Sequence, residues 1–215
     1  MRAFLAVVVA ASFAVPLAAH AQVEDPDNTV ADGGVLPAGW SARVDGNGSL
    51  DNVRFVEVAD GYHATMGPAA VFYNQDWGKS GDYEVSARMT QMIAPRHPEA
   101  YGLVIGGANL DEPTQSYSYF LVRGTGEYFI ATRNGDERVK IVDWTAHPAI
   151  EKQDDEGTQT NVLGIEVSGD QVIFSVNGTE VTRRPTAEIA TNGLFGFRIN
   201  HNLDVMIDQV DRGES

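Results

Sequence analysis

The sequence contains no cysteine among its 215 residues. It can therefore form no disulfide, no thiolate metal site, no cysteine nucleophile and no lipid-modified N-terminal cysteine. Stability has to come from the burial of apolar surface. The 43% of hydrophobic and 21% of charged residues are typical of a folded globular chain and exclude a disordered or collagen-like one.

Basic side chains are also scarce, with 15 Lys and Arg against 30 Asp and Glu, which gives a net charge of -15 at pH 7. Phosphate backbones and anionic lipid surfaces repel such a chain, so nucleic acid is not an expected partner. The one long apolar run, residues 3–15, is too short for a spanning helix. We therefore predict no membrane span.

Residues 1–21 have the organisation of a signal peptide. Arg2 supplies a positive start, the apolar run follows, and Ala19-His20-Ala21 matches a small-x-small cleavage pattern. We predict cleavage before Gln22 and export to the periplasm or the extracellular medium. The next segment, 22–38, is rich in Asp, Gly and Pro without apolar periodicity, which predicts a mobile N-terminal segment ahead of a single domain over 39–215.

Alternation of apolar and polar residues dominates from residue 40 onward and predicts strands with one buried side. In 82–89 the apolar residues Tyr83, Val85, Ala87 and Met89 occupy every second position. Four later segments repeat the pattern: Leu163, Ile165 and Val167; Val172, Phe174 and Val176; Phe195, Phe197 and Ile199; Leu203, Val205 and Ile207. About a dozen short strands are expected. No long helix is expected, although 149–156 could form a turn or two.

Turn residues separate these strands. Asn134-Gly135 and Asn177-Gly178 predict type I′ hairpins, and Gly169-Asp170 predicts another tight link. Strands joined by short hairpins pair antiparallel, and two such sheets can bury their apolar faces against each other. We predict an all-β, antiparallel jelly-roll β-sandwich, with a lipocalin-like closed barrel as the alternative.

Several segments of 40–211 resemble exported bacterial domains of the concanavalin A-like lectin/glucanase superfamily, in particular those of 3-keto-disaccharide hydrolase type. The segments that carry the resemblance are 67–73, 81–84, 101–107, 119–124, 176–178, 193–198 and 200–204. The resemblance implies a curved sandwich whose concave sheet binds carbohydrate in many relatives and hydrolyses it in some. The Glu-x-Asp-x-x-Glu strand motif of laminarinase-type members is absent, so the paired carboxylates of that retaining mechanism are missing.

Two groups of residues are candidates for contacts with a glycan. Tyr117, Tyr119 and Arg123 share the parity of one strand, where aromatic rings can stack on a sugar and a guanidinium can donate to it. Arg198 and Asn200 belong to the densest polar cluster of the chain. An ordinary sheet surface and a capped turn are the alternatives for the two groups.

The same polar cluster supplies candidates for acid–base catalysis. His201 is the natural proton carrier, because the unperturbed pKa of histidine lies near neutrality. Asp204 or Glu84 could act with it as acid and base on a modified glycoside such as a 3-keto sugar. Whether the chain is an enzyme is left open by these residues.

The loop 45–51 carries oxygen-bearing side chains at every second position, namely Asp45, Asn47, Ser49 and Asp51, as in the first half of a calcium loop. Leu50 and Val56 stand where the glycine and the bidentate glutamate would be, so a solvated hairpin is favoured over calcium. We predict that the protein requires no cofactor, with calcium at this loop as the alternative.

Together these features predict an exported lectin-like sandwich that binds a glycan or polysaccharide on its concave sheet. The alternatives are a glycoside-acting hydrolase or lyase and a structural envelope domain without a small ligand. The oligomeric state is not predicted.

Overall fold

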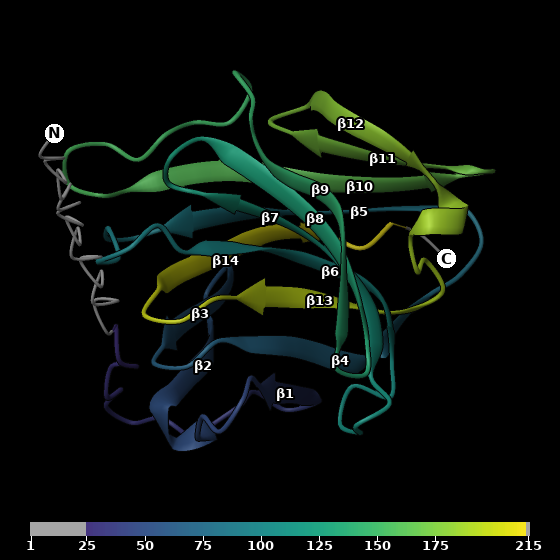
Figure 1. Ribbon diagram of the computed structural model, residues 1–215. Coiled ribbons are helices and arrows are strands. Elements are labelled where there is room, and N and C mark those ends of the chain that lie inside the picture. Colours follow the sequence, from purple (N-terminus) through teal and green to yellow (C-terminus); the bar gives the residue numbers. More distant parts are fainter. Residues whose placement is uncertain (1–24, 214–215) are drawn as a thin grey trace, which may run out of the picture.

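The computed structural model describes residues 25–213 as two seven-stranded antiparallel sheets packed face to face (Figure 1). The predicted signal peptide lies outside the described residues. Sheet A is ordered β1 (Trp40–Val44), β4 (Ala70–Lys79), β13 (Gly193–Ile199), β6 (Ala100–Ala108), β7 (Ser116–Arg123), β8 (Glu127–Asn134) and β9 (Glu137–Ala146). Sheet B is ordered β12 (Thr179–Pro185), β11 (Gln171–Val176), β10 (Gln159–Ser168), β5 (Tyr83–Gln91), β14 (Asp204–Asp211), β3 (Gly61–Met66) and β2 (Val53–Val58).

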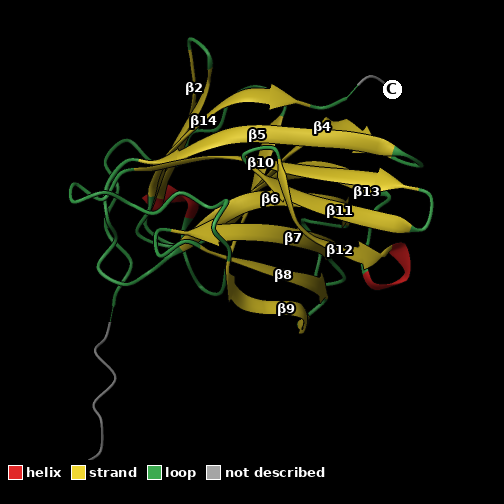
Figure 2. Cartoon of the chain, turned by 90° about the horizontal axis from the view of Figure 1, so that it is seen from above, coloured by secondary structure: helices red, strands yellow, loops and turns green. Residues whose placement is uncertain are grey.

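The predicted all-β jelly-roll sandwich is confirmed. The described helical structure consists of two 3₁₀ turns, η1 (Leu50–Asn52) and η2 (Thr186–Glu188), drawn in red in Figure 2. The predicted turn of helix in 149–156 is wrong, because that segment is an irregular connection between β9 and β10. Open sheets with free edges at β9 and β12 also exclude the closed barrel.

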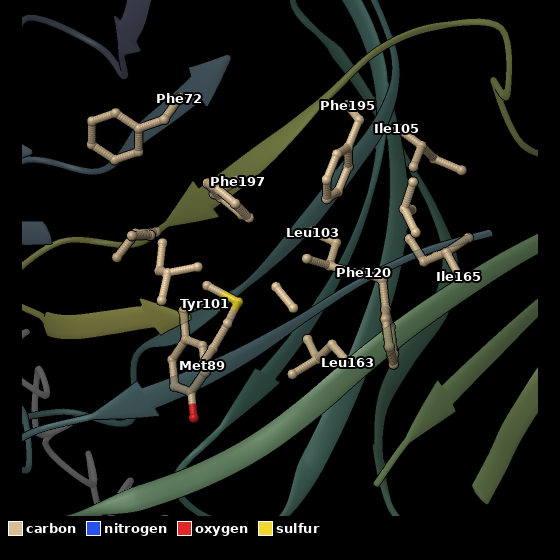
Figure 3. Packing of buried hydrophobic residues seen from close by; sticks show 14 of the residues in the cluster. Phe72, Met89, Tyr101, Leu103, Ile105, Phe120, Leu163, Ile165, Phe195 and Phe197 are labelled. Atoms are coloured by element: carbon tan, nitrogen blue, oxygen red, sulfur yellow. The ribbon is translucent and has the colours of Figure 1, made fainter. Parts of the chain in front are cut away.

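One apolar core lies between the two sheets. All the alternating apolar positions predicted from the sequence belong to it, because period two puts every second side chain on the inner face. Figure 3 shows Tyr101, Leu103 and Phe120 of sheet A facing Met89 and Leu163 of sheet B. The polar residues between these positions are left on the outer faces of the sheets.

The hairpin turns follow the chemistry of their residues. Asn177 and Gly178 have φ angles of 52° and 75°, as the predicted type I′ turn requires. At the β8–β9 turn the prediction is off by one residue. Asn134 pairs with Glu137 inside the ladder, so Gly135 and Asp136 form the turn, and of these two Gly135 has the positive φ angle, 57°.

The described part of the N-terminal segment, 25–38, lies against the sandwich, and its predicted mobility stays a prediction. Val30 is buried, and the amide of Gly34 donates to Val53. The amide of Asn28 donates to Asn202, 2.7 Å away. One buried valine and a few hydrogen bonds to residues distant in the sequence hold the segment against the sandwich. Such contacts produce no periodic pattern, so the sequence alone did not predict them. Within residues 25–213, no helix has the length and apolar character needed to cross a membrane.

Candidate binding face

The outer face of sheet A carries a second apolar cluster, separate from the core. It comprises mostly aromatic and aliphatic side chains from the middle strands: Val71, Tyr73, Ala100, Val104, Leu110, Tyr117, Tyr119, Leu121, Phe129 and Ala131. Trp144 of β9 packs against it and is itself partly exposed. We call this surface the outer face of sheet A.

A cavity of about 160 Å³ lies on this face. Pockets for drug-sized ligands usually measure about 300–1,000 Å³, so this one has room for a single small ring or substituent rather than a whole oligomer. Its lining combines aromatic side chains with polar and charged ones: Tyr119, Leu121, Phe129, Arg138, Lys140, Asp143, Trp144, Arg198 and Asn200.

Arg198 is fixed in this lining by an ion pair and a hydrogen bond. Its Nη2 lies 2.5 Å from Oδ2 of Asp45, and its Nη1 donates to the Tyr117 hydroxyl at 3.5 Å. Burial lowers the pKa of Arg198, but the charge and hydrogen bond of Asp45 together with Tyr117 and Tyr119 raise it by more, so the guanidinium stays charged. The guanidinium carbon also lies 5.4 Å from the ring centre of Tyr119.

Trp144 is oriented by two neighbours. Its ring centre lies 5.0 Å from that of Phe129, and the guanidinium of Arg123 lies 4.2 Å from its ring centre. Arg123 is held in turn by Glu127, whose Oε2 accepts from Nε at 2.9 Å. A hydrogen bond from Thr125, together with the charge of Arg123, lowers the pKa of Glu127. The tryptophan is thus presented in a set orientation at the edge of the cavity.

The structure brings together all five residues predicted to contact a glycan, but their roles differ from the prediction. The side chains of Tyr117 and Tyr119 are only 2% and 5% exposed, so they form the floor of the face rather than platforms for stacking. Arg198 and Asn200 line the cavity directly, and Arg123 contacts it through Trp144.

Sequence reasoning missed Arg138, Lys140 and Trp144, which all lie at even positions of β9. The alternation was interrupted by Ile141 and Val142, which both pack against the core because the β8–β9 register shifts at this point. The shared parity of Arg138, Lys140 and Trp144 was the available signal.

The three predicted catalytic residues lie apart. Nε2 of His201 is 2.9 Å from Glu99, and its Nδ1 is 3.1 Å from Asp27. Asp204 instead contacts Nε2 of His63 at 2.7 Å, on the outer face of sheet B. Glu84 is exposed on β5, also in sheet B. The predicted pairing of His201 with Asp204 or Glu84 is therefore not present. Strand order decides this, since successive strands β13 and β14 lie in different sheets.

His201 nevertheless has a strongly acidic environment. Glu99, Asp27 and Asp25 all lie within 4.0 Å of its ring nitrogens. Burial lowers the pKa of His201, but the charge of Glu99 and the hydrogen bonds to Asp27 and Glu99 raise it by more, so the net pKa lies above 6.5. Two of these carboxylates belong to the N-terminal segment, and the imidazolium links that segment to the sandwich.

Stability should therefore fall as the pH rises from 6 to 9. A folded-state pKa above the unfolded value adds stability below pH 6.5, and this contribution disappears as the pH passes the raised value. We expect His201→Gln to flatten the dependence of the urea midpoint on pH in this range. His147→Gln, which removes an imidazole that forms no ion pair among the described residues, is the control and should keep the wild-type slope. Equal slopes for wild type and His201→Gln would refute the assignment.

The loop predicted as a calcium site has other contacts. Asp45 pairs with Arg198, and Ser49 Oγ caps η1 by accepting from the amide of Asp51 at 3.1 Å. Asn47 is exposed. Across 25–213, no three or more His, Asp or Glu side chains are grouped so that they could hold a metal ion. Calcium binding at this loop stays a prediction, and Asp45 and Ser49 have structural roles that need no metal.

Comparison of the sequence with protein-family models and with curated proteins finds no match. Solved structures do match the fold. A carbohydrate-binding module, CBM66 from Bacillus subtilis, is 12% identical, covers 80% of this chain and 93% of its own, and gives a TM-score of 0.57. A Bacillus subtilis protein of unknown function with a galectin-like fold is 14% identical, covers 80% of this chain and 87% of its own, and gives a TM-score of 0.53.

These matches show that the chain has the concanavalin A-like jelly-roll sandwich fold, the fold that the sequence resemblance implied. At 12% and 14% identity the likeness is one of fold. The chemistry of the site has to be argued from the side chains on the outer face of sheet A.

Proposed function

We propose that this protein is an exported lectin-like domain that binds a glycan on the outer face of sheet A. One observation carries the proposal: Asn200 lines the same cavity as the partly exposed Trp144, and its buried Oδ1 has no hydrogen-bond partner among the described residues. An unpaired buried acceptor is costly unless a ligand donates to it. A sugar hydroxyl can make that donation while an apolar face of the ring packs on tryptophan.

The amide of Asn200 is held in place for this role. Its Nδ2 donates to Oε2 of Glu99 at 3.1 Å, which directs Oδ1 away from that carboxylate. The same Glu99 binds His201, so one carboxylate orients both residues. The carbohydrate-binding name of the CBM66 neighbour agrees with this proposal.

The hydrolase alternative has less support. His201, Asp204 and Glu84 do not share a site. A substrate bound at His201 would therefore not contact either of the carboxylates predicted to act with this histidine. Incubation with 3-keto-disaccharides tests it directly. Turnover that disappears in His201→Ala would replace the binding proposal with a catalytic one.

The binding proposal predicts that Trp144→Ala weakens glycan affinity by about tenfold or more, as truncation of a central aromatic contact does. A screen against a panel of oligosaccharides and polysaccharides identifies a ligand, and calorimetric titration measures its affinity for each variant. Asn200→Leu should weaken binding as well because the acceptor is lost. Val139→Ala, also on β9 but outside the cavity lining, should bind as wild type does. The proposal is contradicted if the protein binds no member of the panel at millimolar concentration. It is also contradicted if Trp144→Ala has the same glycan affinity as the wild type.

A further inference from the structure

The outer face of sheet A gathers basic side chains in an otherwise acidic protein. Of the 15 Lys and Arg residues, six lie on this face or beside residues that do: Arg43, Arg123, Arg133, Arg138, Lys140 and Arg198. The whole chain has a net charge of -15, so this clustering runs against its average. The local potential at such a surface decides which charged ligands approach it.

The charges that line the 160 Å³ cavity are not balanced. Arg138, Lys140 and Arg198 supply three positive charges, and Asp143 supplies one negative charge. Asp45 is not part of this lining but forms an ion pair with Arg198, which reduces the excess of positive charge to one. Lys140 contacts Asp143.

Arg138 accounts for this excess. It is exposed, lies 6.0 Å from the ring centre of Phe129, and has no carboxylate within 4.0 Å among the described residues. Its position at the edge of the cavity leaves the fork of its guanidinium free to bind an anion in bidentate fashion.

Charged residues on an edge strand also serve to prevent sheet-to-sheet aggregation. The other edge of the sandwich, β12, shows what that role looks like in this protein. There Arg183 pairs with Glu180 and Arg184 with Glu188, both with N–O distances below 3 Å. Every cation on that edge is neutralised, whereas Arg138 on β9 is not. Edge protection therefore explains the presence of charge on β9 but not the guanidinium of Arg138, which forms no ion pair among the described residues.

We infer that the glycan bound on the outer face of sheet A is acidic, and that its carboxylate or sulfate group enters the cavity between Arg138, Lys140 and Arg198. The inference rests on the proposed function and names its substrate class. The anion pairs with the free guanidinium of Arg138, while Asn200 Oδ1 accepts from a neighbouring hydroxyl because an acceptor cannot face the anion itself. Trp144 packs against the sugar ring that carries the charge.

The test compares charged and neutral forms of the same polymers. Polygalacturonate is titrated beside its fully methyl-esterified form, and dextran sulfate beside dextran, at low and high NaCl. We expect the charged member of one pair to bind more tightly, with affinity that falls as salt rises because exposed charges are screened. The carboxylate pair and the sulfate pair distinguish the two sources of the anion.

Arg138→Gln combined with Lys140→Gln should lower the affinity for the charged polymer by about tenfold, as loss of complementary charge at a binding site does. It should leave the unfolding midpoint unchanged. Arg183→Gln with Arg184→Gln removes the same charge from β12 and should bind as wild type.

Equal loss in the two double variants means general attraction to polyanions and overturns the inference. Binding of the neutral polymers alone, abolished in Trp144→Ala, also overturns it while the proposed function stands. Absence of binding to every polymer contradicts both.

Discussion

Phe197→Ala is expected to lower the free energy of unfolding by about 3–5 kcal/mol, the usual range for truncation of a buried phenylalanine. The ring is fully buried and lies at the centre of an aromatic cluster. Its centre is 5.7 Å from those of Trp40 and Phe195 and 5.9 Å from that of Trp77. Neighbours from β1 and β4 and from β13 itself all lose contacts at once, and rigid indoles cannot collapse into the space.

Urea unfolding followed by tryptophan fluorescence measures this loss. Domains typically have about 5–15 kcal/mol of stability, so a loss of this size takes a large share of it. The thermal midpoint should fall by roughly 10 °C for a chain of this length. Val162→Ala, at a position 37% exposed on β10, is the matched control and should shift the midpoint little. A loss below about 1 kcal/mol in Phe197→Ala would show that the cluster repacks.

The core could be predicted from the sequence because it depends on local periodicity. Tyr83, Val85 and Met89 alternate with polar residues, and burial on one side of a strand requires that pattern. The turn at Asn177-Gly178 was predictable for a similar reason, since a type I′ turn demands two positive φ angles and these two residues tolerate them.

The partners of the polar residues were not predictable in the same way. Arg198 pairs with Asp45, which is 153 residues distant in the sequence, and His201 binds Glu99, 102 residues away. Asp204 contacts His63, which is 141 residues away on β3, the neighbouring strand of sheet B. Proximity in the sequence placed His201 beside Asp204, but the chain crosses from sheet A to sheet B between them. Strand order, which periodicity does not encode, therefore determines which polar groups meet.

Gln159→Leu is expected to lower the free energy of unfolding by about 3 kcal/mol, since it leaves several buried polar groups without partners at about 1–3 kcal/mol each. Gln159 is 2% exposed. Its Oε1 accepts from the hydroxyl of Tyr101 at 2.9 Å, and its Nε2 donates to the carbonyls of Arg123 and Glu151. Burial raises the pKa of Tyr101, so its hydroxyl stays protonated and needs an acceptor.

A second substitution separates these lost hydrogen bonds from a packing defect. In Gln159→Leu the Tyr101 hydroxyl keeps only its long 3.5 Å contact with the Gln159 carbonyl. Adding Tyr101→Phe removes this poorly paired hydroxyl, so the double variant should recover about 1 kcal/mol relative to Gln159→Leu alone. If the two substitutions are simply additive, the hydroxyl is not what makes Gln159→Leu costly.

The same glutamine connects the interior to the proposed binding face. By binding the carbonyls of Arg123 and Glu151 it ties the end of β7 to the connection between β9 and β10. Loss of these bonds should speed hydrogen exchange of amides in 149–158 more than in β5 or β14, because local opening then costs less than global unfolding. Since Arg123 orients Trp144, glycan affinity should weaken in Gln159→Leu even at temperatures where the protein stays folded. Unchanged exchange in 149–158 together with unchanged affinity would mean that Gln159 stabilises the interior without positioning the binding face.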